Sequence, residues 1–553
     1  MKKLMIGIDL GTTYSCAAVL TDAGTVEMAS NKDSGDSTTP SVVLIQPKKK
    51  NLVGSGAKSL IGPLVSADGG EAKEQRDNGF YLHPKNTKAV IETAKRHIGT
   101  KKVYKVGKEE YNPTFVSGAI LKKIKQDVEE SYGQEVDRAV ITVPAHFNNQ
   151  KRQQTIDAAH MAGLEVDHII NEPSSAALAY SMSSQIDGIY AVYDFGGGTF
   201  DCSIVETKGE KVTILGSNGV QKLGGRDLDE RLLEIVRTKY KKETKKDINP
   251  RQFSPQDAER QKIRLSTLDE IEVVIDGGKA IVITRKEFEE SISILVNMSL
   301  ASFDNALVKA NKKHGITIDN IMDVILVGGT SRVPLVQEAL KNKIGKKPKV
   351  YGNPDETVAK GAAIYVALNN KRSLNVNQKA AISGLEIKEI TNVCLGETLA
   401  AKDGDIISQP IIEKGSRIPA SKSNTSFIPF EMIKASITNQ LPAIPVKQTI
   451  TESYTDAGIN DIVSLDDVEI VFDEDNLWIP SPLALKMQAG DDIASYSKIK
   501  TTFKIDANQV FRIIVKHPYS GTTLVDKELS MKEGSLGATK GGLDDDLDGF
   551  DIE

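Results

Sequence analysis

The chain has 553 residues. A single hydrophobic core stops growing near about 250–300 residues, so we expect two or three domains. Its 39% hydrophobic and 26% charged residues are ordinary for a globular protein, and 70 basic against 75 acidic residues leave no basic excess that would favour nucleic acid. Residues 1–10 hold only a short apolar run before Asp9, so neither a signal peptide nor a membrane span is expected there.

Short Val/Ile-rich runs alternate with helical patterns up to about residue 370, which predicts α/β architecture. The runs end at Gly, Pro or Asp, as buried strands do. Strands are expected at residues 5–10, 138–143, 189–195 and 323–327, and helices at 148–162, 172–182, 227–241 and 334–344.

An internal echo links two parts of this region. The stretch from Ile8 to Thr13 reads IDLGTT, and the stretch from Tyr193 to Asp201 reads YDFGGGTFD. Each is an apolar strand followed by Asp, an apolar residue, a glycine turn and Thr. The pattern predicts two related halves, each giving one loop to a shared cleft.

Both loops are suited to holding phosphate groups. Gly11 and the glycines at 196–198 let the backbone approach a phosphate without a Cβ in the way, and nearby threonines add hydroxyl donors. Asp9 and Asp194 end strands and suit Mg²⁺ held mainly through water. Further glycine turns lie at 224–225 and 328–329, whereas no GxxxxGK[ST] loop and no strand–GxGxxG–helix site is present. Each motif alone is more typical of an ordinary turn, and only their ordered conjunction favours a nucleotide site.

The cysteines and the C-terminal third add less specific information. Cys16, Cys202 and Cys394 lie far apart, which favours a reducing compartment, hence the cytoplasm, without a disulfide framework. Residues 379–391 are expected to form a linker, and 392–533 a β-sandwich, because short strand patterns alternate there with turn signals. The acidic residues 534–553 are expected to be disordered.

These motifs together resemble the heat shock protein 70 family, the DnaK-like molecular chaperones. The matching stretches are 6–16 (IGIDLGTTYSC), 94–99 (AKRHIG), 140–147 (VITVPAHF), 170–180 (INEPSSAALAY), 193–201 (YDFGGGTFD), 223–229 (LGGRDLD), 324–334 (VILVGGTSRVP) and 353–363 (NPDETVAKGAA). The resemblance covers about residues 1–370, and more faintly 391–533. It implies an actin-like ATPase domain with ribonuclease H-like halves at 1–378, with lobe I at about 1–185 plus 355–378 and lobe II at about 186–354.

The resemblance also implies the roles of individual residues. The catalytic set would be Lys95, Glu172, Asp194 and Thr199, with Asp9 and Asp194 around the metal. The nucleotide would be bound by Gly11, Thr12, Thr13, Tyr14, Gly196, Gly197, Gly198, Gly224, Gly225, Glu259, Lys262, Ser266, Gly328, Gly329, Arg332 and Asp355. Pro144 and Arg152 resemble the relay between nucleotide state and the second domain. Without the resemblance, Lys95 is more typical of a surface helix, and Glu259 and Lys262 of an exposed helical pair.

The implied function is that of an ATP-driven chaperone. It would use ATP, ADP and Mg²⁺, with K⁺ as a further candidate, and would hydrolyse ATP slowly unless a partner stimulates it. Its partners would be unfolded or extended polypeptides, a J-domain co-chaperone and a nucleotide exchange factor, and neither nucleic acid nor a membrane is expected. Two alternatives stay open: a nucleotide-binding regulatory or exchange-factor-like relative, and an actin-like filament protein or small-molecule kinase.

Several departures from the family pattern qualify these expectations. Arg226 stands where the family usually has Glu, and Phe195 where it usually has Leu. Residues 59–83 form an extra segment, which is expected to be a surface loop. The linker stretch 385–390 alternates in polarity, which would let it pair as an edge strand on the first domain. No counterpart of the family's helical lid is expected after the β-domain, and a lidless clamp should lose its substrate quickly.

Overall fold

The computed structural model describes residues 3–427, 461–480 and 498–528, with gaps at 48, 146, 148, 185–186, 209–210, 276–278, 349, 351, 389–390, 392–393, 401–405, 414–415, 466–467, 473–475, 509 and 517–520. These residues divide into two compact units, one of residues 3–146 and 154–387 and one of residues 147–153 and 388–528. The tail 534–553 lies outside the described residues.

The first lobe of the larger unit is built on a twisted sheet whose parallel and antiparallel strands meet at β1. Its order is β12-β11-β1-β2-β3, with β4 also paired to β2. The strands are β1 (Leu4–Asp9), β2 (Tyr14–Leu20), β3 (Val26–Met28), β4 (Thr39–Pro40), β11 (Val136–Val143) and β12 (Glu165–Asn171). β1 runs parallel to β11 and antiparallel to β2, so the β1–β2 turn lies at the carboxyl end of β1.

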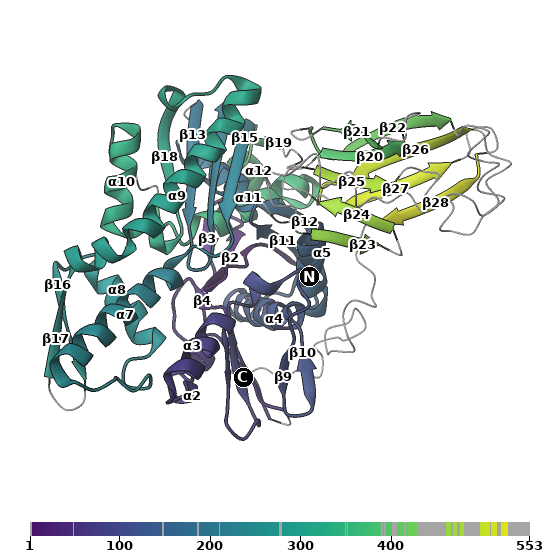
Figure 1. Ribbon diagram of the computed structural model, residues 1–553. Coiled ribbons are helices and arrows are strands. Elements are labelled where there is room, and N and C mark those ends of the chain that lie inside the picture. Colours follow the sequence, from purple (N-terminus) through teal and green to yellow (C-terminus); the bar gives the residue numbers. More distant parts are fainter. Residues whose placement is uncertain are drawn as a thin grey trace. The chain divides into compact units, whose positions relative to one another are not determined.

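The second lobe repeats this plan. Its sheet has the order β18-β13-β14-β15-β19, and β13 runs parallel to β18 and antiparallel to β14. The strands are β13 (Gly188–Phe195), β14 (Phe200–Lys208), β15 (Lys211–Val220), β18 (Ile321–Val327) and β19 (Glu386–Lys388). Asp9 lies opposite Cys16 in the first hairpin, and Asp194 lies opposite Asp201 in the second. The predicted internal echo is therefore a repeated strand–turn–strand unit (Figure 1).

Two helices cover the first sheet at unusually short range. α6 (Glu172–Ser184) begins directly after β12, and α11 (Thr357–Asn369) packs against α6, β1 and β2. A Cβ at Gly7 would lie 2.0 Å from the backbone nitrogen of Ala363, and one at Gly361 would lie 1.8 Å from the carbonyl oxygen of Ser175. Glycine at both positions therefore permits backbone-to-backbone packing that no other residue would allow. α4 (Pro113–Tyr132) and α5 (Asn149–Met161) are the other long helices here.

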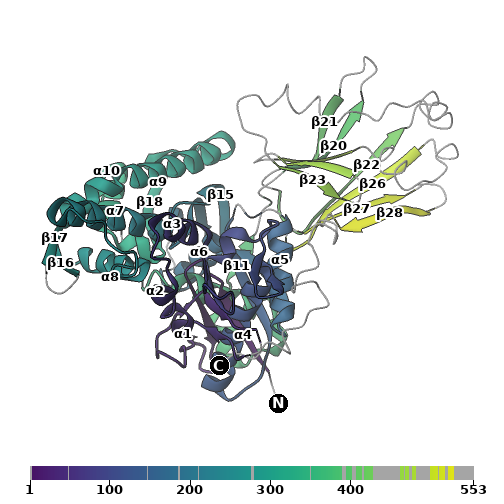
Figure 2. The same cartoon turned by 60° about the horizontal axis from the view of Figure 1, so that its bottom comes forward.

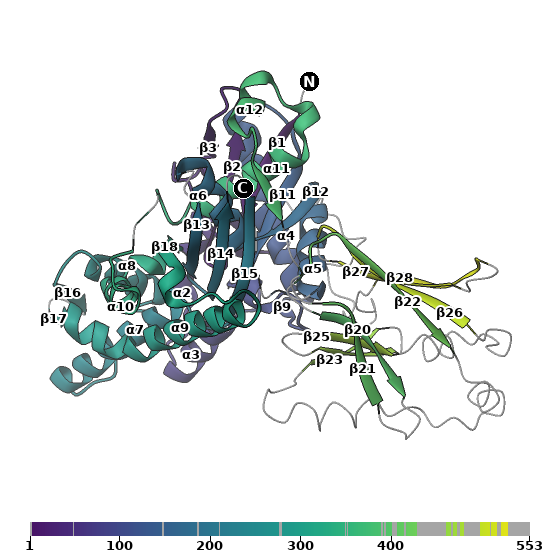
Figure 3. The same ribbon diagram turned by 90° about the horizontal axis from the view of Figure 1, so that it is seen from above.

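In the second lobe a long helix, α9 (Arg285–His314), packs against α7 (Gly225–Thr244) and α10 (Pro334–Ile344), as Figure 2 shows. α8 (Pro255–Leu265) packs on α7 and contacts the hairpin of β16 (Glu270–Ile275) and β17 (Lys279–Thr284). Figure 3 shows α9 alongside β14 and β15. In the described part of the chain only α9 is long and apolar enough to cross a membrane. One face of α9, with Ile292, Val296 and Phe303, packs in the core of the second lobe, while Ile294 and Val308 are exposed.

The extra segment 59–83 is not the surface loop that the sequence predicted. It contains α2 (Ile61–Leu64), α3 (Gly69–Asn78) and β7 (Phe80–Leu82), and β7 is the edge of a small sheet in the order β6-β5-β8-β7. The other strands of this sheet are β5 (Val42–Ile45), β6 (Leu52–Val53) and β8 (Ala89–Glu92), and α1 (Ser55–Lys58) packs on β5 and β6. The Asp68 side chain caps α3 by accepting from the Glu71 amide, and Gly79 ends the helix in the left-handed conformation.

The described residues from 388 onward form two β-sheets, which confirms an α/β region followed by a β-rich region. One sheet has the order β21-β20-β25-β24-β23 and the other β22-β26-β27-β28. The strands are β20 (Cys394–Ala400), β21 (Ile406–Ile412), β22 (Ala420–Phe427), β23 (Asp461–Leu465), β24 (Val468–Phe472), β25 (Asn476–Pro480), β26 (Lys498–Ile505), β27 (Phe511–Lys516) and β28 (Thr523–Glu528). Alternate residues Phe511, Ile513 and Val515 are buried, as expected of a strand with one covered face.

The connection between the units is ordered where it leaves the larger one. α12 (Val376–Ala381) is followed by β19, and the division between the units falls at 387/388, inside the predicted linker. β19 pairs beside β15 at the edge of the second-lobe sheet. The expectation that this alternating stretch pairs as an edge strand is confirmed.

We predict that Gly7→Ala lowers the free energy of unfolding by about 1–3 kcal/mol, because the new methyl group forces α11 away from β1. Urea unfolding followed by circular dichroism would measure it. Gly69→Ala is the matched control, since nothing lies within 4 Å of a Cβ at that position. Equal stability of the two variants would show that the close packing of α11 does not constrain the fold.

Candidate active site

The turns of the two repeated hairpins face each other across one cleft of the larger unit. A Cβ at Gly197 would lie 2.1 Å from Thr13 Oγ1, and one at Gly198 would lie 2.2 Å from Thr12 Cγ2. A third glycine turn closes over the second, since a Cβ at Gly224 would lie 2.5 Å from the Gly197 carbonyl carbon. The predicted meeting of one loop from each half is thus present, and glycine at these positions permits the close approach of the loops.

An ion pair lies buried beside these loops. Lys95, from the 3₁₀ helix η1 (Ala94–His97), places its Nζ 2.6 Å from Oε1 of Glu172, the first residue of α6. The two residues are only 7% and 5% exposed. Asp9 lies close enough to influence both, and its Oδ1 accepts a hydrogen bond of 3.2 Å from Thr142 Oγ1.

The surroundings perturb the titration of each of these groups. Burial raises the pKa of Glu172 to about 7, although the Lys95 ammonium opposes the shift. Burial also raises the pKa of Asp9, and it raises that of Asp194 well above the usual value, with help from the charges of Glu172 and Asp201. For Lys95, burial acts to lower the pKa, but the carboxylates of Glu172 and Asp9 outweigh it and raise the pKa. The cluster thus holds more carboxylate than its one lysine neutralises.

A hydrated magnesium ion fits this cluster. Excess buried carboxylate is stabilised by an added cation, and Mg²⁺ keeps much of its water when proteins bind it. Among the described residues no group of three or more His, Cys, Asp or Glu is arranged to hold a metal directly. Thr13 Oγ1 is buried without a hydrogen-bond partner, so a hydroxyl is available for an anionic ligand in the same place.

Most of the predicted nucleotide-site residues line one cavity of about 810 Å³. This volume suits a ligand of cofactor size. Those on its wall are Asp9, Gly11, Thr12, Thr13, Tyr14, Lys95, Glu172, Asp194, Gly196, Gly197, Thr199, Gly225, Glu259, Lys262, Gly328, Gly329, Arg332 and Asp355. Gly198 and Gly224 lie directly behind this wall, packed on Thr12 and Gly197. Ser266 does not line the cavity, and its hydroxyl lies 3.4 Å from the Lys262 carbonyl oxygen.

The far end of the cavity is held by two further ion pairs. Arg332, at the end of η3 (Gly329–Arg332), lies 3.0 Å from Asp355, and a Cβ at Gly329 would lie 3.1 Å from the same carboxylate. Lys262 lies 2.7 Å from Asp229 and donates to the Gly225 carbonyl oxygen at 3.1 Å. These residues come from η3, α7 and α8, so the second lobe supplies most of this end.

The proposed relay residues lie outside the cavity. Pro144 is buried directly after β11, and Arg152 is a buried residue of α5 whose Nε donates to the Phe147 carbonyl oxygen at 3.1 Å. The division of the chain assigns Pro144 to the larger unit and Arg152 to the smaller one. Their part in communication stays a prediction.

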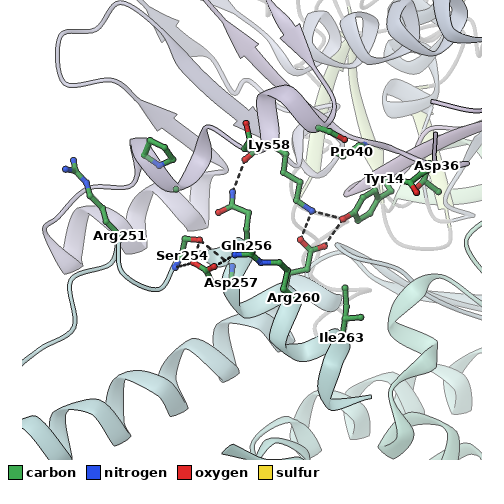
Figure 4. A pocket seen from close by; sticks show the side chains of 16 residues that line it. Tyr14, Asp36, Pro40, Lys58, Arg251, Ser254, Gln256, Asp257, Arg260 and Ile263 are labelled. Atoms are coloured by element: carbon green, nitrogen blue, oxygen red, sulfur yellow. Dashed lines mark hydrogen bonds and ion pairs between the residues drawn. The ribbon is translucent and has the colours of Figure 1, made fainter. Parts of the chain in front are cut away.

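Several residues of the site, Asp229 among them, were not nominated from the sequence. Asp201 faces Asp194 across the hairpin, and Thr142 bonds to Asp9; strand register could have identified both. Arg96 reaches across the cleft to the Gly198 carbonyl oxygen at 2.8 Å and to Asp227 at 3.0 Å. Lys58 lies 2.5 Å from Glu259, whose carboxylate also accepts from the Tyr14 hydroxyl at 3.2 Å. Figure 4 shows this contact beside a second cavity of about 750 Å³.

Comparison with known protein families identifies the chain. A family model described as "Hsp70 protein" matches residues 5–440, which is most of the chain. The chain belongs to the Hsp70 family. The match spans nearly all of the larger unit and the first strands of the β-rich unit, so the glycine loops and the buried Lys95–Glu172 pair lie within the matched region.

We predict that Gly197→Ala weakens ATP binding by at least about tenfold, because the new methyl group would push the Thr13 loop away and open the phosphate grip. Isothermal titration calorimetry with Mg²⁺ would measure the change. Gly56→Ala in α1 is the control, since its Cβ would find its nearest neighbour at 3.8 Å. Unchanged affinity in Gly197→Ala would mean that phosphate does not lie between these loops.

Proposed function

We propose that this chain is an ATP-dependent molecular chaperone, which hydrolyses ATP to ADP and phosphate and couples nucleotide state to binding and release of unfolded polypeptide segments. The observation that carries the proposal is the buried Lys95–Glu172 pair beside two facing glycine loops. A site for binding alone would not require a buried ammonium and carboxylate, since burying such a pair brings little net stability.

The proposed hydrolysis is phosphoryl transfer to water, which depends on positioning and charge stabilisation more than on covalent chemistry. Backbone amides of the glycine loops and the hydroxyls of Thr13 and Thr199 would bind the phosphate oxygens. Lys95 would stabilise charge that develops on the transferred group, and Glu172 would orient the attacking water. When bound, Mg²⁺ would neutralise phosphate charge, with Asp9 and Asp194 holding its water shell.

Coupling to the β-rich unit is proposed to run through the connecting strand. Each lobe contributes one phosphate-binding loop, so the nucleotide state would set the angle between the lobes. β19 is the edge strand of the second-lobe sheet and leads directly into the β-rich unit. A β-sheet unit can bind extended peptides through backbone hydrogen bonds with little sequence preference. A J-domain co-chaperone and an exchange factor are the proposed partners.

A cytoplasmic location belongs to the same proposal. Cys16 and Cys202 are free and buried, which suits a reducing compartment. No particular observation favours the regulatory or filament-forming alternatives over the chaperone. ATP-dependent light scattering without peptide stimulation would favour a filament protein, and full function in cells after loss of hydrolysis would favour a regulatory role.

We predict that Lys95→Ala lowers the single-turnover rate of ATP hydrolysis by about 10²–10³-fold, as loss of one charge-stabilising donor does in other enzymes. Quench-flow with radiolabelled ATP would measure the rate, and calorimetry would confirm that ATP still binds. Lys105→Ala is the control, because its exposed ammonium lies 3.2 Å from Glu110 and outside the cavity. Hydrolysis at the wild-type rate in Lys95→Ala would exclude the proposed catalytic role.

We also predict that unfolded peptide or a J-domain partner raises ATP turnover, and that Ile387→Pro removes this stimulation while basal turnover persists. Proline at the centre of β19 removes a backbone donor from an edge strand. Steady-state phosphate release with and without a panel of peptides would measure it, with Ile387→Val as the control that keeps the strand. If partners still stimulate ATP turnover in Ile387→Pro, coupling through β19 is excluded. If no partner stimulates ATP turnover of the wild type, the result counts against the chaperone proposal.

A further inference from the structure

Two features that set this chain apart from the family pattern meet each other in the fold. The extra segment 59–83 forms α3 and β7 in the first lobe, and Arg226 stands near the start of α7 in the second lobe. α3 supplies Arg76, and the neighbouring strand β8 supplies Glu92. All these residues lie within the larger unit, and Arg76, Glu92 and Arg226 line the same cavity as the phosphate loops.

The first contact is a two-pronged ion pair. Arg76 Nε lies 2.9 Å from Glu230 Oε2, and its Nη2 lies 2.9 Å from Oε1 of the same carboxylate. Arg76 is only 4% exposed, so water cannot easily replace these bonds. Paired parallel bonds from guanidinium to carboxylate are among the strongest polar contacts in proteins. This pair joins α3 of the first lobe to α7 of the second.

The second contact uses the reversed charge at position 226. Arg226 Nη1 lies 2.5 Å from Glu92 Oε1, and its Nη2 donates to the carbonyl oxygen of Arg76. The Tyr81 hydroxyl, on β7, also donates to Glu92 Oε1 at 2.7 Å. A glutamate at position 226, the residue usual in the family, would place two carboxylates together here. The arginine and the extra segment therefore form one complementary set.

We propose that Arg76, Glu92, Arg226 and Glu230 form a latch across the cleft that holds the lobes closed over bound nucleotide and slows its release. In this proposal nucleotide leaves as the lobes part, and parting α3 and β8 from α7 breaks both contacts of the latch. Affinity differences among closely related complexes lie mainly in the dissociation rate. We therefore expect the latch to change the rate at which nucleotide dissociates. The inference rests on the proposed nucleotide binding and adds a retention device particular to this chain.

The test measures release of a fluorescent ADP analogue from the full-length protein with Mg²⁺, chased with excess ADP in a stopped-flow instrument. Glu230→Gln keeps the side-chain shape but removes the charge opposite Arg76, and we expect release to become about tenfold faster. Glu234→Gln is the matched control. Its carboxylate lies one turn further along α7 and pairs at 3.1 Å with Arg231 of the same helix, so release should stay within about twofold of wild type.

A charge exchange separates a latch from a merely structural effect. Arg226→Glu alone should accelerate release by about tenfold or more, because it faces Glu92 with a like charge. Adding Glu92→Arg should slow release again by at least about threefold, since the pair is restored with its polarity reversed. Thermal unfolding of each variant would confirm that it is folded at the assay temperature.

The possible failures are distinguishable. If the wild type retains the analogue but Glu230→Gln and Arg226→Glu release it at the wild-type rate, the latch is wrong and nucleotide binding stands. If Arg226→Glu accelerates release and the added Glu92→Arg does not slow it, the contact between these two residues is not what retains the nucleotide. If the wild type does not bind the analogue at all, the proposed function and the latch fall together.

Discussion

A buried ammonium facing more carboxylates than it can neutralise is the interaction on which the rest of this structure depends. Lys95 and Glu172 are almost fully covered, and Asp9, Asp194 and Asp201 add negative charge around them. Two charges in such a place bring little stability to the fold by themselves. Their placement makes sense when a further cation and a polyanion complete the cluster, which is the reason for proposing phosphate chemistry here.

The repeated hairpin explains how this cluster can respond to a ligand. Asp9 and Asp194 occupy equivalent places on β1 and β13, each at the carboxyl end of a strand with a parallel neighbour on one side and an antiparallel neighbour on the other. Each lobe therefore carries one of the two facing glycine loops at the end of a strand. In the proposed mechanism, a change in the ligand between these loops would move one sheet relative to the other, and β19 pairs at the edge of the second sheet.

The sequence predicted those parts of the molecule in which local chemistry dictates local structure. The strands and helices that flank the glycine loops lie where the apolar patterns placed them, and most nominated residues line one cavity. Segment 59–83 was wrongly taken for a loop, although Asp68 and Gly79 mark the two ends of a helix there. Arg96, Lys58 and the contact between Arg226 and Glu92 could not have been predicted, because each joins residues far apart in the chain.

Hydrogen–deuterium exchange with and without Mg²⁺ and ATP tests the central claim most directly, since it reports on both lobes at once. If nucleotide lies between the lobes, the backbone amides of residues 10–14, 196–199 and 328–332 should all exchange more slowly after ATP is added, and to a similar extent. Protection confined to the loops of a single lobe, or no protection in any of the three, would contradict the account.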